Sequence, residues 1–214
     1  MNKLLWFDLE TTGLDAQRCA IVTGDFISET YGSVTELFHM ECSPHEGAYI
    51  SPEALTVQGI TYDTLMRMPD PTQAYWLLCA FFKKHINQFD KTDKFMIAGY
   101  NPGFDVSFLS AFFKYMEDDY LGSFIDRRRV IDVRSIAVMC EELGLIPPLE
   151  NYKLVTLAKH FEVEFKAHDS AEDIMVTRNI YRNHLLPLIM REMRKPKTKM
   201  HPFLHRIAIL FGIR

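Results

Sequence analysis

Residues 4–15 read LLWFDLETTGLD, and this stretch indicates both the fold and the place of a site. The apolar run 4–7 is typical of a central strand that is covered on both faces. Asp8 and Glu10 follow two positions apart, so in a strand their side chains leave the same face. Two carboxylates beside apolar residues repel each other unless a divalent cation such as Mg²⁺ or Mn²⁺ binds between them. A metal site and a solvated strand end are both consistent with this pair.

The next three residues, Thr11, Thr12 and Gly13, are predicted to form a tight turn beside the two acids. Free backbone N–H groups in such a turn can hold a phosphate or a sugar hydroxyl. An ordinary turn without a ligand is the alternative interpretation.

The composition is that of a globular protein, with 48% hydrophobic and 24% charged residues in a chain of 214, enough for one domain with a full core. The net charge of −4 argues against wrapping a long nucleic acid, but not against holding a few nucleotides through a metal ion. The longest apolar run, 75–82, is too short to cross a bilayer, and Asp8 argues against a signal peptide, so no membrane contact is expected. Scattered cysteines without C-x-x-C spacing predict reduced core thiols in a cytoplasmic protein: Cys19, Cys42, Cys79 and Cys140.

The pattern along the chain predicts a mixed five-stranded α/β sheet with helices on its faces. Strand patterns at 19–27 and 34–42, joined by the turn-like SETYGS, form an antiparallel meander with the first strand. Alternation follows, with strands at 95–100 and 130–133, helices at 105–116, 135–143 and 154–161, and a helix from Ser170 that Pro187 ends or kinks. Asp70 and Pro71 predict the start of a helix that buries Ala74, Leu77, Leu78, Phe81 and Phe82. In such sheets, sites gather at the carboxyl ends of the strands.

Three more candidate site residues follow later strands. Asp105 lies in GYNPGFDVSFL, just past the fourth strand, where it is also well placed as an acid in the first turn of a helix. His168 and Asp173 lie in AHDSAEDI and converge if His168 is on a loop and Asp173 in the first helical turn. Ser170 and Asp173 also match a capping box, in which the Asp173 carboxylate reaches back to the Ser170 N–H and is less free to bind a metal.

Taken in order, FDLETTGLD, GYNPGFDVSFL and AHDSAEDI resemble the three motifs of the DEDDh 3′–5′ exonucleases, which include the proofreading subunit of bacterial DNA polymerase III. The resemblance covers roughly residues 3–185 and implies a ribonuclease H-like fold. Two departures stand out: Ser170 replaces a small Ala, and Gln58 replaces a His that is frequent in the family. The five family residues are all present: Asp8, Glu10, Asp105, His168 and Asp173.

The resemblance also implies a mechanism and a substrate. The four carboxylates would bind two Mg²⁺ or Mn²⁺ ions, and His168 would take a proton from the attacking water. The products would be nucleoside 5′-monophosphates released from a 3′ end, preferably of single-stranded DNA. Thr11 would contact the terminal sugar and Leu14 would wedge against the last bases. A 3′–5′ exoribonuclease is the nearest alternative.

The chain is predicted to divide into an exonuclease domain, 1–190, and a basic, amphipathic tail, 191–214. The tail carries seven Lys or Arg residues and a single acid, and its last residues place apolar side chains at helical spacing. It either docks on the nuclease or binds a partner such as a polymerase or sliding clamp. A non-catalytic subunit, whose fold only positions this tail, is a further alternative that the intact five-residue set disfavours.

Overall fold

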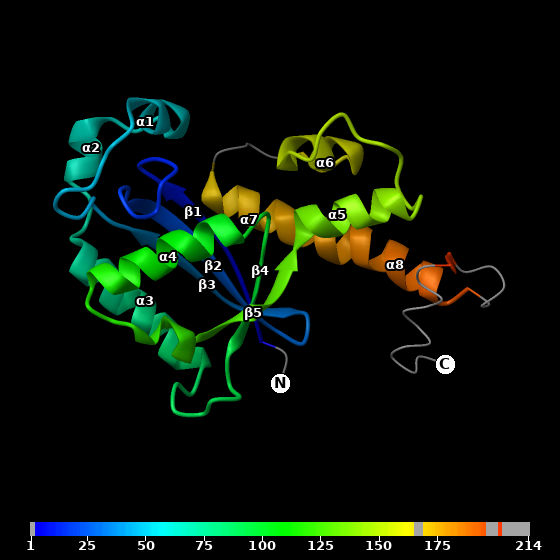
Figure 1. The fold of residues 1–214 in the computed structure, drawn as a ribbon, viewed down its shortest axis with the longest axis horizontal. Coiled ribbons are helices and arrows are strands. Elements are labelled where there is room, and N and C mark those ends of the chain that lie inside the picture. The colour runs from blue at the N-terminus through cyan, green and yellow to red at the C-terminus, as the bar shows by residue number, and fades with distance from the viewer. Residues whose placement is uncertain (1–2, 165–168, 196–200, 203–214) are drawn as a thin grey trace.

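The computed structural model describes residues 3–164, 169–195 and 201–202, and it contains the predicted mixed sheet. The strand order is β3-β2-β1-β4-β5, with β1 in the centre. Strands β1 to β3 pair antiparallel, whereas β1, β4 and β5 run parallel, as Figure 1 shows. The bounds are β1 Lys3–Thr11, β2 Ile21–Thr30, β3 Ser33–Glu41, β4 Phe95–Gly99 and β5 Ile125–Asp132.

Strand β5 begins at Ile125, five residues before the predicted strand, and a bulge interrupts its pairing with β4. Met96 pairs with Asp126, and the next residue, Ile97, pairs with Val130. Residues 127–129, all arginine, are therefore skipped in the β4–β5 register and are exposed on the edge strand. Three consecutive charged residues interrupt the hydrophobic alternation, so the sequence pattern does not predict this part of the strand.

One face of the sheet is covered by α3 (Pro71–His85) and α4 (Gly103–Tyr115) through a cluster of aromatic rings. The Phe82 ring lies 6.3 Å from those of Phe26 and Phe95 on the sheet and 6.4 Å from Phe113 on α4. Asp70 caps α3 by accepting the Thr72 N–H, as predicted. The predicted burial of Leu77 is wrong, because the buried stripe of α3 runs through Tyr75 and Cys79 instead and leaves Leu77 53% exposed.

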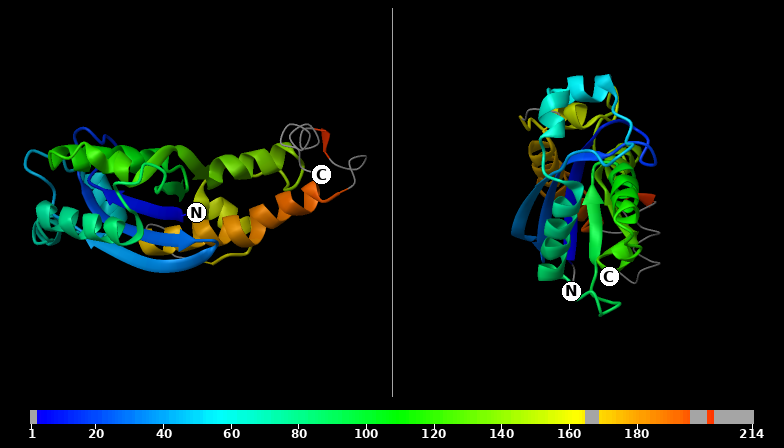
Figure 2. Two further views of the ribbon diagram at one scale, coloured as in Figure 1. Left: turned by 90° about the horizontal axis from the view of Figure 1, so that it is seen from below. Right: turned by 90° about the vertical axis from the view of Figure 1, so that its left-hand side faces the viewer.

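The opposite face is covered by α7 (Ser170–Asn179), which continues through a π-helical turn, η2 (Ile180–Leu185), into α8 (Leu186–Met193). Figure 2 shows this long element running beside the sheet on the side away from α4. Pro187 lacks an N–H group and therefore cannot donate within a regular helix, which explains the break in the helical pattern just before it. The predicted interruption at Pro187 is confirmed, but the helix continues beyond it.

The remaining elements surround these layers: α1 Pro52–Gln58, α2 Tyr62–Met66, η1 Tyr120–Ser123, α5 Val133–Glu142 and α6 Leu154–His160. Figure 1 shows α1 and α2 beyond the end of β1. The four cysteines are free and buried, as predicted. Within the described ranges, none of the helices combines the length and apolar character needed to span a bilayer.

Most of the predicted tail, residues 196–200 and 203–214, lies outside the described residues. The predicted boundary between residues 190 and 191 falls inside α8, which ends at Met193. Glu192, on the last turn of α8, is buried and pairs with Lys195.

Candidate active site

Two acids, Asp8 and Glu10, lie near the carboxyl end of the central strand, β1. Its apolar residues alternate between the two faces and are buried, which anchors the strand. Asp8 and Glu10 leave the α7 face, where Asp8 lies directly opposite Asp25 of β2 in the antiparallel register. The same-face arrangement predicted from their spacing is therefore present.

Helix α7 delivers a third acid, Asp173, to the same place. The helix is capped by Asp169, whose carboxylate accepts the N–H groups of Ala171 and Glu172. The predicted capping box at Ser170 is wrong, because the cap lies one residue earlier and the Ser170 hydroxyl donates to Asp25 instead. Asp173 therefore lies one residue beyond the position that a capping box requires.

The three acids form a compact cluster. One carboxylate oxygen each from Asp8, Glu10 and Asp173 lie within 4.8 Å of one another, and all three residues are partly exposed. Oxygen atoms at this mutual distance can contact one divalent cation, and carboxylates are the ligands that Mg²⁺ and Mn²⁺ prefer. The donor set therefore fits a hard divalent cation.

Asp105 approaches from the opposite helix layer. It lies in the first turn of α4, only 4% exposed, and its Oδ1 accepts the backbone N–H of Leu9 at 3.1 Å. Leu9 lies between Asp8 and Glu10 in β1, so this hydrogen bond fixes Asp105 next to the cluster. An acid that only interacted with the helix dipole would not be stabilised by such burial, because burial disfavours its charged form.

Electrostatics support a site built for cations. Burial, followed by repulsion from Asp105, Asp173, Glu10 and Asp25, raises the pKa of Asp8 well above its ordinary value. Burial and the charges of Asp173 and Asp169 raise the pKa of Glu10 to about 7. Burial also raises the pKa of Asp105 to about 7, partly opposed by its backbone hydrogen bonds. A bound cation relieves the repulsion between neighbouring carboxylates and favours their ionised form.

The TTG segment differs from the prediction of free N–H groups. The Thr12 N–H donates to Ala20 O at 2.8 Å, and the Thr12 hydroxyl donates to Tyr49 O. The Thr11 hydroxyl donates to Gly13 O at 2.7 Å. These hydrogen bonds hold the segment in one conformation. The Thr12 donors are already used, so a ligand there would contact the surface of the turn and not the Thr12 N–H or hydroxyl group.

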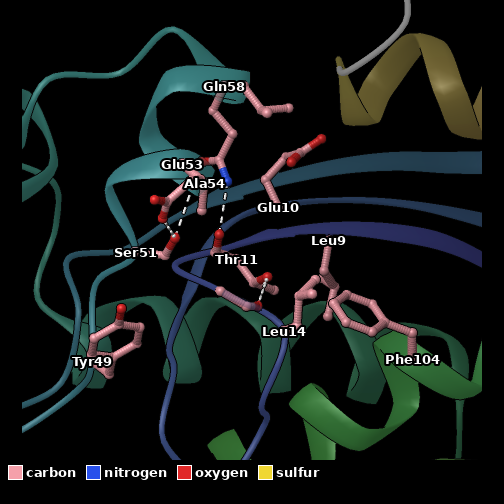
Figure 3. A pocket seen from close by; sticks show the side chains of 12 residues that line it. Leu9, Glu10, Thr11, Leu14, Tyr49, Ser51, Glu53, Ala54, Gln58 and Phe104 are labelled. Carbon is pink, nitrogen blue, oxygen red and sulfur yellow. Dashed lines mark hydrogen bonds between the residues drawn. The ribbon is translucent and has the colours of Figure 1, made fainter.

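A cavity of about 500 Å³ opens beside the acids, and Figure 3 shows its lining. Glu10 and Thr11 form the side next to the cluster, and Leu14, 88% exposed, lies at the rim. Gln58 donates its amide to Thr11 O at 2.7 Å, which ties α1 to the end of β1. The wall is otherwise mostly apolar or aromatic, and the sequence interpretation missed these contributors: Leu9, Tyr49, Ala54, Val57 and Phe104.

His168 lies outside the described residues, so its predicted place on a loop before α7 stays a prediction. The first described residue after it is Asp169, the cap of α7. The structure thus brings together Asp8, Glu10 and Asp173, with Asp105 bonded to the strand between the first two.

The solved structures similar to this chain include two named Exonuclease I. Escherichia coli Exonuclease I in complex with a dT13 oligonucleotide superposes with a TM-score of 0.73 at 19% identity, covering 93% of this chain and 45% of that one. Exonuclease I from Methylocaldum szegediense gives a TM-score of 0.68 at 18% identity, covering 93% and 44%. The protein therefore has the ribonuclease H-like fold of these nucleases, as its sequence predicts.

Residues 5–181 match the family model described as Exonuclease (RNase_T), and the chain belongs to this exonuclease family. Two similar curated proteins are both named DNA polymerase III PolC-type. The one from Halalkalibacterium halodurans is 30% identical over 172 residues, and the one from Bacillus subtilis is 28% identical over 167. The matches cover 79% and 77% of this chain but only 10% of either relative.

Proposed function

We propose that the protein is a metal-dependent 3′–5′ exonuclease that releases nucleoside 5′-monophosphates from the 3′ ends of single-stranded DNA. The observation that carries this proposal is the cluster of three carboxylate oxygens within 4.8 Å of one another beside an open cavity. Family membership supports the reaction class. The oligonucleotide bound by Exonuclease I supports single-stranded DNA as substrate.

Asp8, Glu10, Asp105 and Asp173 would hold two Mg²⁺ or Mn²⁺ ions at the scissile phosphate. Such ions supply a water nucleophile at neutral pH and stabilise the charge that develops on the phosphate oxygens. The chain itself contributes geometry, because the four carboxylates are held on three elements of the fold, β1, α4 and α7. His168, with an ordinary pKa of about 6.5, would accept the proton of the attacking water.

The cavity would hold the terminal nucleotide of the substrate. Glu10, a proposed metal ligand, and the exposed side chain of Leu14 both line it. Apolar and aromatic walls suit a sugar and a base without reading the sequence. Thr11, at the end of β1, would contact the terminal sugar.

The proposed activity predicts a ladder of products that shortens from the 3′ end. Purified protein is incubated with 5′-labelled single-stranded DNA, with recessed and mismatched duplexes and with RNA, each in Mg²⁺ or EDTA. We expect the ladder on single-stranded DNA in Mg²⁺ and none in EDTA, because the carboxylates alone cannot stabilise the transition-state charge.

The same assay decides between the alternatives. A ladder on RNA alone would identify an exoribonuclease. The absence of a ladder on every polymer would contradict the proposal and favour a non-catalytic subunit.

The name of the PolC-type relatives makes a polymerase a reasonable partner, and residues 191–214 are the proposed contact for it or for a sliding clamp. We further propose that the protein acts in the cytoplasm and that residues 1–190 form its nuclease domain.

Leu14→Ala is expected to raise KM for a single-stranded oligonucleotide about threefold to tenfold with kcat nearly unchanged. Leu14 is 88% exposed, so the substitution removes a contact with the substrate and nothing from the core. One lost apolar contact of this size is worth about 1 kcal/mol. Steady-state kinetics checks the result, and Leu37→Ala, which truncates another exposed leucine (63%) on β3, serves as the control. Unchanged KM in Leu14→Ala would remove Leu14 from the proposed binding surface.

A further inference from the structure

The start of α7 is attached to strand β2 by a side-chain hydrogen bond between residues 145 positions apart. Ser170 Oγ donates to Asp25 Oδ2 at 2.5 Å, and Ser170 is only 5% exposed. The other oxygen of Asp25 lies 2.9 Å from His39 Nδ1 on β3. Because both carboxylate oxygens have partners, the orientation of Asp25 is fixed.

Strand β2 also holds the far end of α7. Glu29 lies four residues after Asp25 and therefore leaves the same face of the strand. Its fully buried carboxylate accepts the Arg178 Nε–H at 2.7 Å and also binds Arg182. The helix is thus attached to β2 at two points, and Asp173 lies in the segment between them.

The Ser170 contact is the one next to the candidate site. Asp25 pairs with Asp8 in the β1–β2 register, and its charge is one of those that raise the pKa of Asp8. Ser170 precedes Asp173 by three residues, about one helical turn. A small rotation or displacement at Ser170 would therefore change the distance of Asp173 from Asp8 and Glu10.

We propose that Ser170 and Asp25 are positioning residues, which hold α7 so that Asp173 shares a cation with Asp8 and Glu10. This inference rests on the proposed function. Neither residue needs to contact the cation, since the hydrogen bond acts through the placement of α7. The Glu29 contact maintains the packing of the helix, whereas the Ser170 contact sets the geometry at its metal-binding end.

The test is the affinity for Mn²⁺, measured by calorimetry on the full chain without substrate. Ser170→Ala removes the hydroxyl without a change of charge, and Asp169 still caps the helix, so the variant should fold. We expect about tenfold weaker Mn²⁺ binding, in the range typical of lost outer-shell contacts. In the trimming assay, kcat should fall by a similar factor while KM stays within about twofold.

A matched control is Ser135→Ala, which removes another serine–aspartate hydrogen bond at the start of a helix. Ser135 Oγ donates to Asp132 Oδ2 at 2.6 Å at the beginning of α5. This variant should bind Mn²⁺ as the wild type does. Melting curves in EDTA confirm that each variant is folded at the temperature of the titration.

A double-mutant cycle with Asp25→Asn separates the hydrogen bond from a general effect of charge. If the two residues act through their contact, Asp25→Asn weakens Mn²⁺ binding less in the Ser170→Ala background than in the wild type. Strictly additive losses would overturn the inference, as would wild-type affinity in Ser170→Ala. A wild-type chain that binds Mn²⁺ but trims no polymer contradicts the proposed function alone, and one that binds no Mn²⁺ contradicts both.

Discussion

Asp8→Asn is expected to reduce trimming of single-stranded DNA by at least about 10³-fold, a loss of about 4 kcal/mol of transition-state stabilisation. Asp8 is the centre of the carboxylate set, repelled by Asp105, Asp173 and Glu10 at once. Asparagine keeps the shape of the side chain but removes the charge that would bind a cation. Rates of product formation from a 5′-labelled oligonucleotide measure the effect.

The same variant should melt at a higher temperature than the wild type in EDTA. Burial and like charges raise the pKa of Asp8, so its ionised form is unfavourable in the folded state without a cation. A neutral amide relieves this repulsion. Stability and activity are thus expected to change in opposite directions, as at other sites where function opposes folding.

Asp119→Asn is the control, because Asp119 is an exposed acid beyond the C-terminal end of α4 that makes no capping hydrogen bond. It should leave both the rate and the melting temperature unchanged. If Asp8→Asn retained activity within about tenfold of the wild type, the assignment of the carboxylate cluster as the catalytic centre would be wrong.

The parts of the fold that local patterns determine could be predicted. The run before Asp8 is apolar without interruption, which predicts a central strand, and the strand order β3-β2-β1-β4-β5 places β1 in the centre. Alternate residues of a strand lie on the same face, so the placement of Asp8 and Glu10 on one face could be predicted from this segment alone. Asp70 and Pro71 likewise set the start of α3 through their own backbone chemistry.

The errors arise where a distant residue decides between local options. Both Asp169 and Ser170 are good helix caps, and the choice depends on Asp25, which takes the Ser170 hydroxyl from 145 positions away. The Thr12 donors look free in the sequence but are used by Ala20 and Tyr49. Local propensity cannot reveal such tertiary partners.

The sequence alone does not place Asp25 next to the site, for a related reason. Its position opposite Asp8 follows only from the register of the β1–β2 pair. A shift of that register by one residue would put Asp25 on the other face, among the aromatic rings of α3. The sequence pattern therefore predicts the strands of the sheet. Without the register, it does not predict which residues lie opposite each other on neighbouring strands.

Binding of Mg²⁺ or Mn²⁺ is expected to raise the melting temperature by about 5–10 °C at a metal concentration about 100 times the Kd. A ligand at that excess contributes about 2.7 kcal/mol to the free energy of unfolding. For a chain of this size, each kcal/mol corresponds to about 2–4 °C. Thermal melting in EDTA and in the metal ion measures the difference directly.

This stabilisation should increase with pH. The folded-state pKa values of Glu10 and Asp105 are raised to about 7, above the ordinary values of 4.5 and 3.8. The folded protein therefore holds protons that the unfolded chain has lost, so without metal the contribution of these groups to stability falls as pH rises through this interval. A cation binds the ionised carboxylates and competes with those protons, so its effect is small near pH 4.5 and largest above about pH 7.

The difference between melting temperatures with and without metal isolates the site, because groups elsewhere titrate equally in both samples. Asp8→Asn provides the matched control and should lose most of the metal-induced shift at every pH. If Mg²⁺ and Mn²⁺ left the melting temperature of the wild type unchanged above about pH 7, the cluster of Asp8, Glu10 and Asp173 would not be a cation site. If the shift were instead equal at low and high pH, the cation would bind away from these carboxylates, since only a site with raised pKa values makes protons compete with the metal.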